Sequence, residues 1–175
     1  MTLEGEELTV IISMPIPETE EEFRNIPLSI LDITERKELE ARIRQDAYFD
    51  SLTGLPNRAL MNDRILQSVA LARRDNRQVG VFFFDLDRFK LINDTQGHAV
   101  GDMVLRSVAQ RLKKFIREGD TFARLSGDEF VIIQADPNHD PNFTTLGRRI
   151  LETLGLPFQI DNREFFTTAS IGVAI

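Results

Sequence analysis

Residues 79 to 87 constrain the fold more than any other stretch of the chain. Val79 to Phe84 are six apolar or glycine residues in a row, rich in β-branched and aromatic types, which predicts a central strand buried on both faces. Such a strand is expected to end in neutral residues, yet Asp85 and Asp87 follow it. Residues two apart on a strand point to the same face, so the two carboxylates can converge. The sequence therefore predicts a sheet with an acidic site at the end of a central strand.

A second acidic site follows a predicted β-hairpin. We expect this hairpin over residues 121 to 134, with a tight turn at Ser126-Gly127 and then Asp128 and Glu129 at the start of the second strand. Two adjacent carboxylates at a hairpin tip repel each other unless a cation or solvent screens them. An exposed polar turn would by itself explain the hairpin, but the first acidic strand end favours a functional site. Together these carboxylates suit Mg²⁺ and a polyphosphate.

The remaining elements follow from hydrophobic periodicity and from capping and turn residues. We expect helices over residues 34–49, 56–76, 88–93, 99–117 and 144–154, and further strands over 6–16, 26–33, 157–161 and 164–175. Loops are expected at residues 94–97 and 136–142. Strands interleaved with long helices indicate an α/β or α+β sheet with helices packed on it. The sequence contains no P-loop, so carboxylates and metal would have to carry a bound polyphosphate.

Several spaced motifs resemble the GGDEF domain, the diguanylate cyclase family of bacterial signalling proteins. In chain order they are residues 50–58, 84–90, 93–98, Gly101-Asp102 and Ser126-Gly127-Asp128-Glu129-Phe130. The resemblance covers residues 47 to 175 and implies a palm-like, ferredoxin-related sheet with flanking helices, as in nucleotide cyclases. Ser126 departs from the family pattern, which has glycine there, and glycine tolerates a positive φ more readily.

The N-terminal region carries a separate resemblance. Residues 28 to 40 are similar to the last strand of a PAS sensor domain with its exit helix. We therefore expect a two-strand PAS/PAC remnant at 1–33, a linker helix at 34–49 and a GGDEF domain at 50–175 that stops before the family's last helix and strand. Most of the PAS fold is missing, so we expect no sensory ligand.

The expected linker helix has a narrow apolar stripe formed by Leu39, Ile43 and Ala47. This stripe fits a helix that lies on its own domain, and equally a short parallel coiled coil that pairs two subunits. Fewer than three heptads are present, so the spacing does not decide between them.

The GGDEF resemblance implies roles for the acidic residues. Asp85 and Asp128, with the backbone carbonyl of Leu86, would bind two Mg²⁺ ions, with Mn²⁺ as an alternative. Asp128 and Glu129 would form the catalytic pair, and Glu129 would assist metal binding or remove a proton from the reacting hydroxyl. Asp87 is either a further ligand or a structural residue that faces the adjacent loop.

The resemblance also implies nucleotide contacts. Lys90 would contact the GTP phosphates, although a solvated lysine on a helix is the simpler reading. Asn93 and Asp102 would recognise guanine, because a carboxylate accepts from guanine N1 and N2 and an amide can meet O6 or N3. Taken alone, Asp102 is equally a charge at a helix terminus. The only histidines are His98 and His139, so neither a histidine metal site nor a catalytic triad is expected.

Arg117 and Asp120 fit the Arg-x-x-Asp pattern of the family's product-inhibition site. They would bind a guanine and a phosphate of cyclic di-GMP. The structural alternative is an arginine that ends a helix, followed by Gly119 at the position after the cap.

The reaction implied by the resemblance is the condensation of two GTP into cyclic di-GMP with release of pyrophosphate. Each domain would hold one GTP, so a homodimer would be needed. The competing hypothesis is a catalytically silent GTP- or cyclic di-GMP-binding regulatory module, of the kind that precedes a phosphodiesterase domain. A net charge of −7 argues against binding a nucleic acid polymer. With no cysteine and no apolar run of about 20 residues, we expect a cytoplasmic protein with no membrane contact in this stretch.

Overall fold

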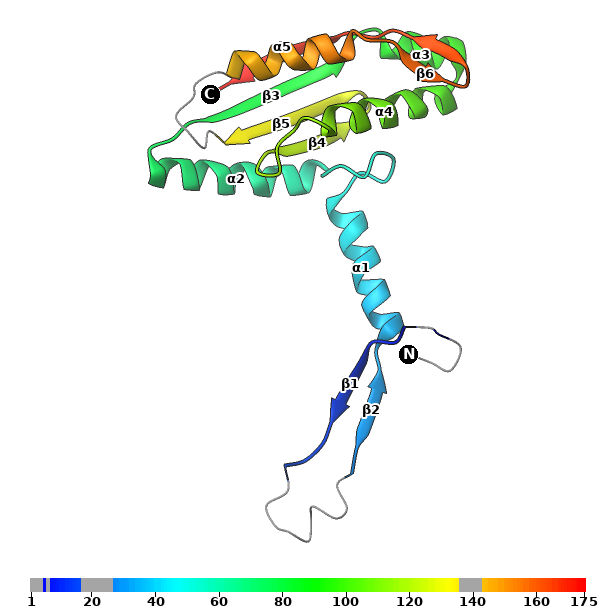
Figure 1. Ribbon diagram of the computed structural model, residues 1–175, viewed down its shortest axis with the longest axis vertical. Helices are drawn as coiled ribbons and strands as arrows, with labels where there is room; N and C mark the ends of the chain where they lie inside the picture. The colour runs from blue at the N-terminus through cyan, green and yellow to red at the C-terminus, as the bar shows by residue number, and fades with distance from the viewer. Residues whose placement is uncertain (1–4, 6, 17–26, 136–142) are drawn as a thin grey trace. The chain divides into compact units, whose positions relative to one another are not determined.

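A computed structural model describes residues 5, 7–16, 27–135 and 143–175 (Figure 1). The chain divides into two units, Met1–Asp46 and Ala47–Ile175. The loop expected at 136–142, which includes His139, and parts of the expected N-terminal strands lie outside the described residues.

The N-terminal unit contains an antiparallel hairpin of β1 (Val10–Ser13) and β2 (Ser29–Asp32), followed by the start of helix α1 (Thr34–Tyr48). The Asp32 carboxylate accepts a hydrogen bond of 2.9 Å from the Thr34 N–H, which satisfies a free donor of the first helical turn. No residue of α1 is buried in the structure, and Leu39 and Ile43 of its apolar stripe are exposed. The hairpin and helix therefore have no core of their own among the described residues.

The C-terminal unit is built on a four-stranded antiparallel sheet with the order β4-β5-β3-β8. The strands are β3 (Val79–Leu86), β4 (Thr121–Ser126), β5 (Glu129–Ala135) and β8 (Ala169–Ala174). Helices α3 (Phe89–Gln96) and α4 (His98–Lys113) connect β3 to β4, and α5 (Phe143–Leu154) leads from β5 towards β8. This is the β-α-β-β-α-β order of ferredoxin-like folds. The predicted α+β sheet with flanking helices is confirmed.

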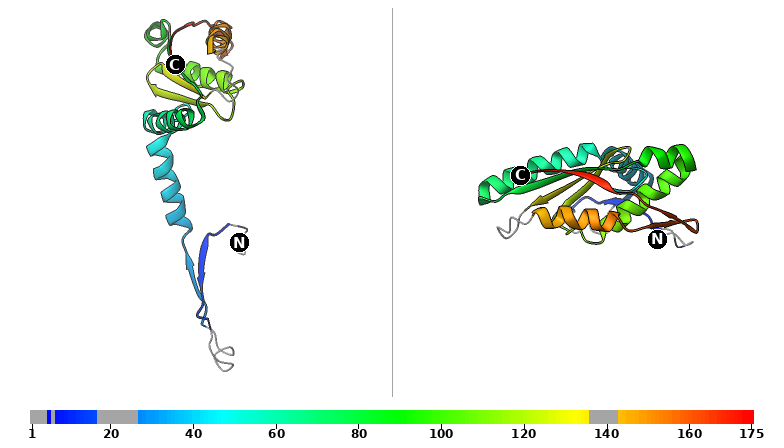
Figure 2. Two further views of the ribbon diagram at one scale, coloured as in Figure 1. Left: turned by 90° about the vertical axis from the view of Figure 1, so that its left-hand side faces the viewer. Right: turned by 90° about the horizontal axis from the view of Figure 1, so that it is seen from above.

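Helices cover both faces of the sheet (Figure 2). On one face, Phe82 and Phe84 of β3 are buried in the main core, to which α4 and α5 contribute. On the other face, Met61 of α2 (Arg58–Asp75) packs in a second cluster with residues of β4 and β5. Because α2 lies mainly over β4, Phe83 of β3 keeps 43% of its surface exposed. The prediction that β3 is buried on both faces is therefore wrong for its C-terminal half.

Helix boundaries differ from the predicted ones for local reasons. Helix α2 begins at Arg58, after Pro56, because the Asn57 side chain accepts from the N–H groups of Ala59 and Leu60 and caps the helix. Helix α3 runs through most of the loop expected at 94–97 and ends at Gly97, whose φ is 86°. Helix α4 stops at Lys113, four residues before Arg117. None of the described helices is long and apolar enough to cross a membrane.

The single strand predicted over residues 164–175 is in fact two strands, β7 (Arg163–Phe165) and β8. Strands β6 (Phe158–Ile160) and β7 form a separate small hairpin, while β8 pairs with β3 in the main sheet. The two-residue turn Asp161-Asn162 has positive φ at both positions, as a tight hairpin turn requires. Strand β8 therefore completes the sheet beside the acidic end of β3.

Candidate functional site

The two predicted acidic sites meet at one end of the sheet. Asp85 of β3 lies directly opposite Glu129 of β5, and residues so paired in an antiparallel sheet point to the same face, with Cβ atoms about 5 Å apart. Asp128 lies in the turn immediately before β5. Within the described residues, no hydrogen bond or ion pair engages the Asp85 carboxylate. The structure thus brings Asp85 and Glu129 together, with Asp128 beside them in the turn.

The turn of this hairpin is shifted by one residue from its predicted place. Ser126 pairs with Glu129, so the two turn residues are Gly127 and Asp128, and a β-bulge falls between Arg124 and Ser126. Gly127 is the residue with positive φ, 48°, whereas Ser126 is not in the left-handed region. The serine that departs from the GGDEF pattern therefore causes no backbone strain. Its hydroxyl donates a hydrogen bond of 2.7 Å to Oε2 of Glu129.

The residues expected to bind the nucleotide lie on α3 and α4, which pack against each other. Lys90 is exposed in the first turn of α3. Asn93 lies further along α3, and a Cβ added at Gly101 of α4 would collide with its side-chain oxygen. Gly101 therefore permits Asn93 to sit against α4, next to Asp102. The structure places Asn93 and Asp102 on one helix pair, where both are half-buried.

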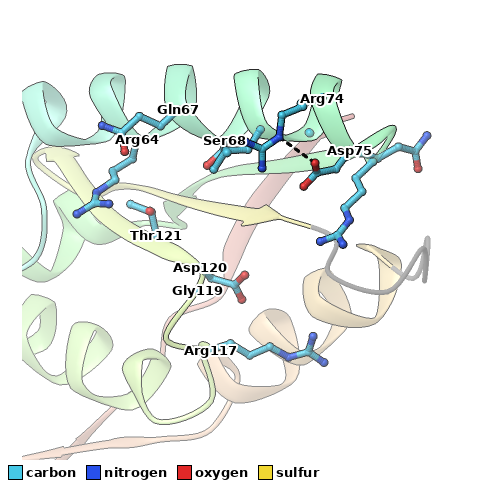
Figure 3. Close-up of a pocket in the computed structure, with 13 residues that line it drawn as sticks. Arg64, Gln67, Ser68, Arg74, Asp75, Arg117, Gly119, Asp120 and Thr121 are labelled. Carbon is cyan, nitrogen blue, oxygen red and sulfur yellow. Dashed lines mark hydrogen bonds and ion pairs between the residues drawn. The ribbon is translucent and has the colours of Figure 1, made fainter.

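Arg117 and Asp120 line a cavity of about 590 Å³ between α2 and the start of β4 (Figure 3). Both follow the end of α4, so the helix-terminus explanation for Arg117 does not hold. Partial burial raises the pKa of the Asp120 carboxyl, against a backbone hydrogen bond from Arg117 and the charge of that residue. Further cations line the cavity, namely Arg64, Arg74 and Arg77 of α2 and the residues that follow it. The lining thus combines four arginines with two acids, Asp75 and Asp120, and Arg74 pairs with Asp75 at 3.1 Å. Such a cavity suits an anionic ligand that also offers hydrogen-bond donors.

Residues 47–175 match the family model described as "Diguanylate cyclase, GGDEF domain". The chain belongs to the GGDEF family. It is 43% identical over 131 residues to MucR of Pseudomonas aeruginosa, named as a bifunctional diguanylate cyclase/cyclic di-GMP phosphodiesterase. That match covers 75% of this chain and 19% of MucR, so the chain spans about a fifth of the length of that relative.

Solved structures agree with this assignment. The GGDEF domain of TpbB from P. aeruginosa is 38% identical, with a TM-score of 0.69 over 72% of this chain and 74% of that one. TpbB itself is named as a diguanylate cyclase, and this chain covers 31% of its length. The coiled coil and GGDEF domain of DgcB from Caulobacter crescentus, solved with cyclic di-GMP, is 26% identical, with a TM-score of 0.71 over 81% of this chain and 75% of that one.

Arg124 links the Gly127-Asp128 turn of this GGDEF domain to the loop that carries Asp50. The Arg124 Nη1 donates to both carboxylate oxygens of Asp50, at 2.9 and 3.0 Å, while Nε and Nη2 donate to the Gly127 carbonyl, at 2.9 and 2.7 Å. Burial would raise the pKa of Asp50, but hydrogen bonds from Thr53 and Arg124 outweigh it and the pKa is lowered. We call these three residues, Asp50, Arg124 and Gly127, the Arg124 clamp. Sequence reasoning missed it, because Asp50 and Arg124 lie far apart in the chain.

Asp87 is engaged by the neighbouring strand. The hydroxyls of Thr168 and Ser170 donate to its carboxylate, and its N–H donates to the Thr168 carbonyl at 2.9 Å. The two hydroxyls lower the pKa of Asp87. Of the two readings of Asp87, this geometry favours the structural one, in which it anchors β8 to the end of β3.

The remaining donors fit a hard divalent cation. The backbone N–H and C=O groups of successive strand residues alternate between the two neighbouring strands. Because the Asp87 N–H donates to Thr168 on the β8 side, the Leu86 carbonyl faces the β5 side. The end of the sheet thus offers the carboxylates of Asp85 and Asp128 and the carbonyl of Leu86. Within the described residues, no three Asp, Glu or His side chains converge closely enough to hold a metal ion by themselves. Mg²⁺ characteristically uses one or two carboxylates together with substrate phosphates and water, so this sparse set fits it.

Proposed function

We propose that this chain is a diguanylate cyclase domain that condenses two molecules of GTP into cyclic di-GMP. The observation that carries the proposal is the location of Asp85, Asp128 and Glu129 at the same end of the sheet, formed by β3 and the tip of the β4–β5 hairpin. These are oxygen donors, the ligands that a divalent cation and a triphosphate require. The family match and the relatives named as diguanylate cyclases support the same chemistry.

Asp85, Asp128 and the Leu86 carbonyl would hold the cations and Glu129 would assist them, with Mg²⁺ as the expected ion and Mn²⁺ as its alternative. A bound Mg²⁺ supplies positive charge beside the phosphates and the reacting hydroxyl. Lys90 would add a cation for the phosphates. Asn93 and Asp102 would bind the guanine edge, where the Asp102 carboxylate accepts from two guanine N–H donors.

In the proposed reaction, the 3′-hydroxyl oxygen of one GTP forms a bond to the α-phosphorus of the other, and the bond to pyrophosphate breaks. Two such steps close the ring and release two pyrophosphates. Oε1 of Glu129 has no hydrogen bond or ion pair among the described residues, so it is the atom available to accept the hydroxyl proton. Asp85, Asp128 and Glu129 line one end of one sheet, so a single domain would present one GTP and a second copy the other. The exposed Leu39 and Ile43 of α1 suit a coiled-coil contact between two such copies.

The Arg117–Asp120 cavity would bind the product. Arg117 would contact a phosphate and guanine, and Asp120 would accept from guanine N–H groups. Neither Asn93 nor Asp102 lines this cavity of about 590 Å³, so product and substrate would occupy separate sites. We expect Arg117→Ala to weaken cyclic di-GMP binding about tenfold, as measured by calorimetry. Lys113→Ala, which changes an exposed cation outside the cavity, is the matched control.

The test is to incubate the purified chain with GTP and Mg²⁺ and to separate the products by chromatography. The parent should form cyclic di-GMP, and a variant carrying Asp128→Ala and Glu129→Ala should not. If the parent forms none but binds cyclic di-GMP, the alternative of a silent regulatory module replaces the cyclase. Two relatives are named only as cyclic di-GMP phosphodiesterases, NbdA of P. aeruginosa and PdeR of Escherichia coli, and they favour keeping that alternative as the second candidate.

A further inference from the structure

The Glu129 carboxylate is held on one side by two groups, the hydroxyl of Ser126, which departs from the family pattern, and the guanidinium of Arg58. The Ser126 hydroxyl donates to its Oε2 at 2.7 Å, and Nη2 of Arg58 lies 3.7 Å from the same oxygen. Both contacts are made to one oxygen, and both come from the β4 and α2 side of the hairpin. Asp85 lies on the opposite side of Glu129, on β3.

Both holding groups have well-defined positions. Arg58 is the first residue of α2, directly after Asn57, whose N–H and side-chain amide donate to the carbonyls of Tyr48 and Ala47 at 2.9 Å each. Ser126 begins the turn whose Gly127 carbonyl accepts two hydrogen bonds from Arg124. The serine hydroxyl and the guanidinium are therefore carried on supported backbone, although both side chains reach solvent.

These contacts engage one oxygen of Glu129 on the side of β4 and α2, which is opposite to the side of Asp85. Residues directly opposite on adjacent strands have Cβ atoms about 5 Å apart, close enough for Asp85 and Glu129 to share a cation. Yet within the described residues these carboxylates do not gather with Asp128 into a metal-holding group. Glu129 instead directs an oxygen to Ser126 and Arg58, where a hydroxyl and a positive charge compensate its charge.

We propose that Ser126 and Arg58 form a holding site for Glu129 that competes with divalent cation binding at the end of the sheet. Ser126 is a positioning residue in this scheme, because it acts through the Glu129 carboxylate. A glycine at position 126 has no hydroxyl and would leave Glu129 free to turn towards Asp85. This inference rests on the proposed function, and it assigns to Ser126 a lowered affinity for the metal.

The experiment measures Mn²⁺ binding by electron paramagnetic resonance, in the presence of 3′-deoxy-GTP, which lacks the attacking hydroxyl. We expect Ser126→Ala and Ser126→Gly to bind Mn²⁺ between about twofold and tenfold more tightly than the parent, the range that corresponds to one net hydrogen bond. Ser126→Thr keeps the hydroxyl and should stay close to the parent. Because Ser126 does not have positive φ, Ser126→Ala carries no backbone penalty.

The decisive control repeats these measurements in a Glu129→Gln background. There Ser126→Ala should no longer change Mn²⁺ affinity, since the carboxylate through which Ser126 acts is gone. An effect of the same size in that background, an unchanged affinity in Ser126→Ala, or no Mn²⁺ binding by the parent would each overturn the inference. Product chromatography decides the proposed function separately: synthesis by a parent insensitive to Ser126 would leave the cyclase standing. Tighter Mn²⁺ binding in Ser126→Ala without any synthesis would leave the holding site and remove the cyclase.

Discussion

The two sides of the β4–β5 turn are built in opposite ways. On the side of the turn that faces Asp50, the Arg124 clamp contains an ion pair in which the side chains of Arg124 and Asp50 keep only 10% and 22% of their surface exposed. On the side that carries the acids, the side chains of Glu129 and Arg58 are 40% and 60% exposed, and Oε2 of Glu129 lies 3.7 Å from Nη2 of Arg58. Asp85 has no hydrogen-bond or ion-pair partner among the described residues. A partly buried, hydrogen-bonded ion pair gives a fixed backbone, whereas the Asp85 carboxylate, which has no such partner, remains free to bind a cation. The turn thus combines a rigid support with a reactive surface.

The largest expected effect is on the rate of synthesis, and it should come from a change at the acidic side of the turn. Asp128→Ala removes a proposed metal ligand and should lower the rate of cyclic di-GMP formation at least about a hundredfold, since a preorganised electrostatic contact is lost. Its melting temperature should not fall, because a carboxylate next to Glu129 contributes repulsion to the fold. Asp63→Ala, on the exposed surface of α2, should change neither quantity. Retention of most of the parent's rate in Asp128→Ala would contradict the assignment.

A change in the Arg124 clamp should mainly lower the stability of the fold, whereas Asp128→Ala should mainly lower the rate of synthesis. Arg124→Met leaves the Asp50 carboxylate half-buried without its partner and should lower the free energy of unfolding by about 2–3 kcal/mol. Urea denaturation measures this. The matched control is Arg148→Met, which breaks an exposed pair with Glu152 and should cost less than about 0.5 kcal/mol. Equal losses in the two variants would remove the distinction between the clamp and the surface.

A comparison of variants at two glycines with positive φ, Gly127 and Gly54, can distinguish the effect of backbone strain from an effect on synthesis. Gly127→Ala and Gly54→Ala each place a Cβ where nothing lies within 4 Å, at φ of 48° and 67°, so each should lose about 1 kcal/mol of stability from the backbone alone. Only Gly127 is adjacent to Asp128, so only Gly127→Ala should also reduce synthesis. A reduction of synthesis in both variants would show that the loop of Asp50 controls the reactive side as strongly as the turn does.

Acid titration gives the smallest effect. The folded pKa of Asp50 is lowered, so its contribution to stability is complete above the unfolded pKa, near 3.9, and is lost as pH falls through the folded pKa. Below about pH 5 the parent should therefore lose stability more steeply than Asp50→Asn. Arg124→Met removes the main charged partner and should flatten the slope in the same direction. Parallel curves for all three proteins would show that the clamp does not depend on the charge of Asp50.

Local patterns were enough to predict most of the elements and the acidic residues that meet. The apolar run of β3, its terminal Asp85 and the hairpin that carries Asp128 and Glu129 are all visible in the sequence. The turn was misplaced by one residue, because the β-bulge after Arg124 shifts the register and no local signal marks it. This shift moves Asp128 from the strand into the turn itself.

Contacts between distant residues were beyond reach of the sequence. The Arg124 clamp, the anchoring of Asp87 by Thr168 and the ion pair of Arg58 with Glu129 each depend on tertiary packing that no spacing along the chain reveals. The division into a PAS remnant at 1–33, a linker at 34–49 and a GGDEF domain at 50–175 stays a prediction, and the family match itself covers residues 47–175. A two-stranded hairpin without a core is compatible with many parent folds.

The central place of β3 also affects how the protein is made. Both of its hydrogen-bonding neighbours, β5 and β8, follow it in the chain, so β3 leaves the ribosome before either is available. The uncharged, β-forming residues 79–84 have the composition of segments that aggregate when exposed. Until the hairpin of β4 and β5 has been synthesised, this segment has no strand to pair with. The strand that presents Asp85 is therefore also a segment of the nascent chain that is exposed to aggregation until its partners are made.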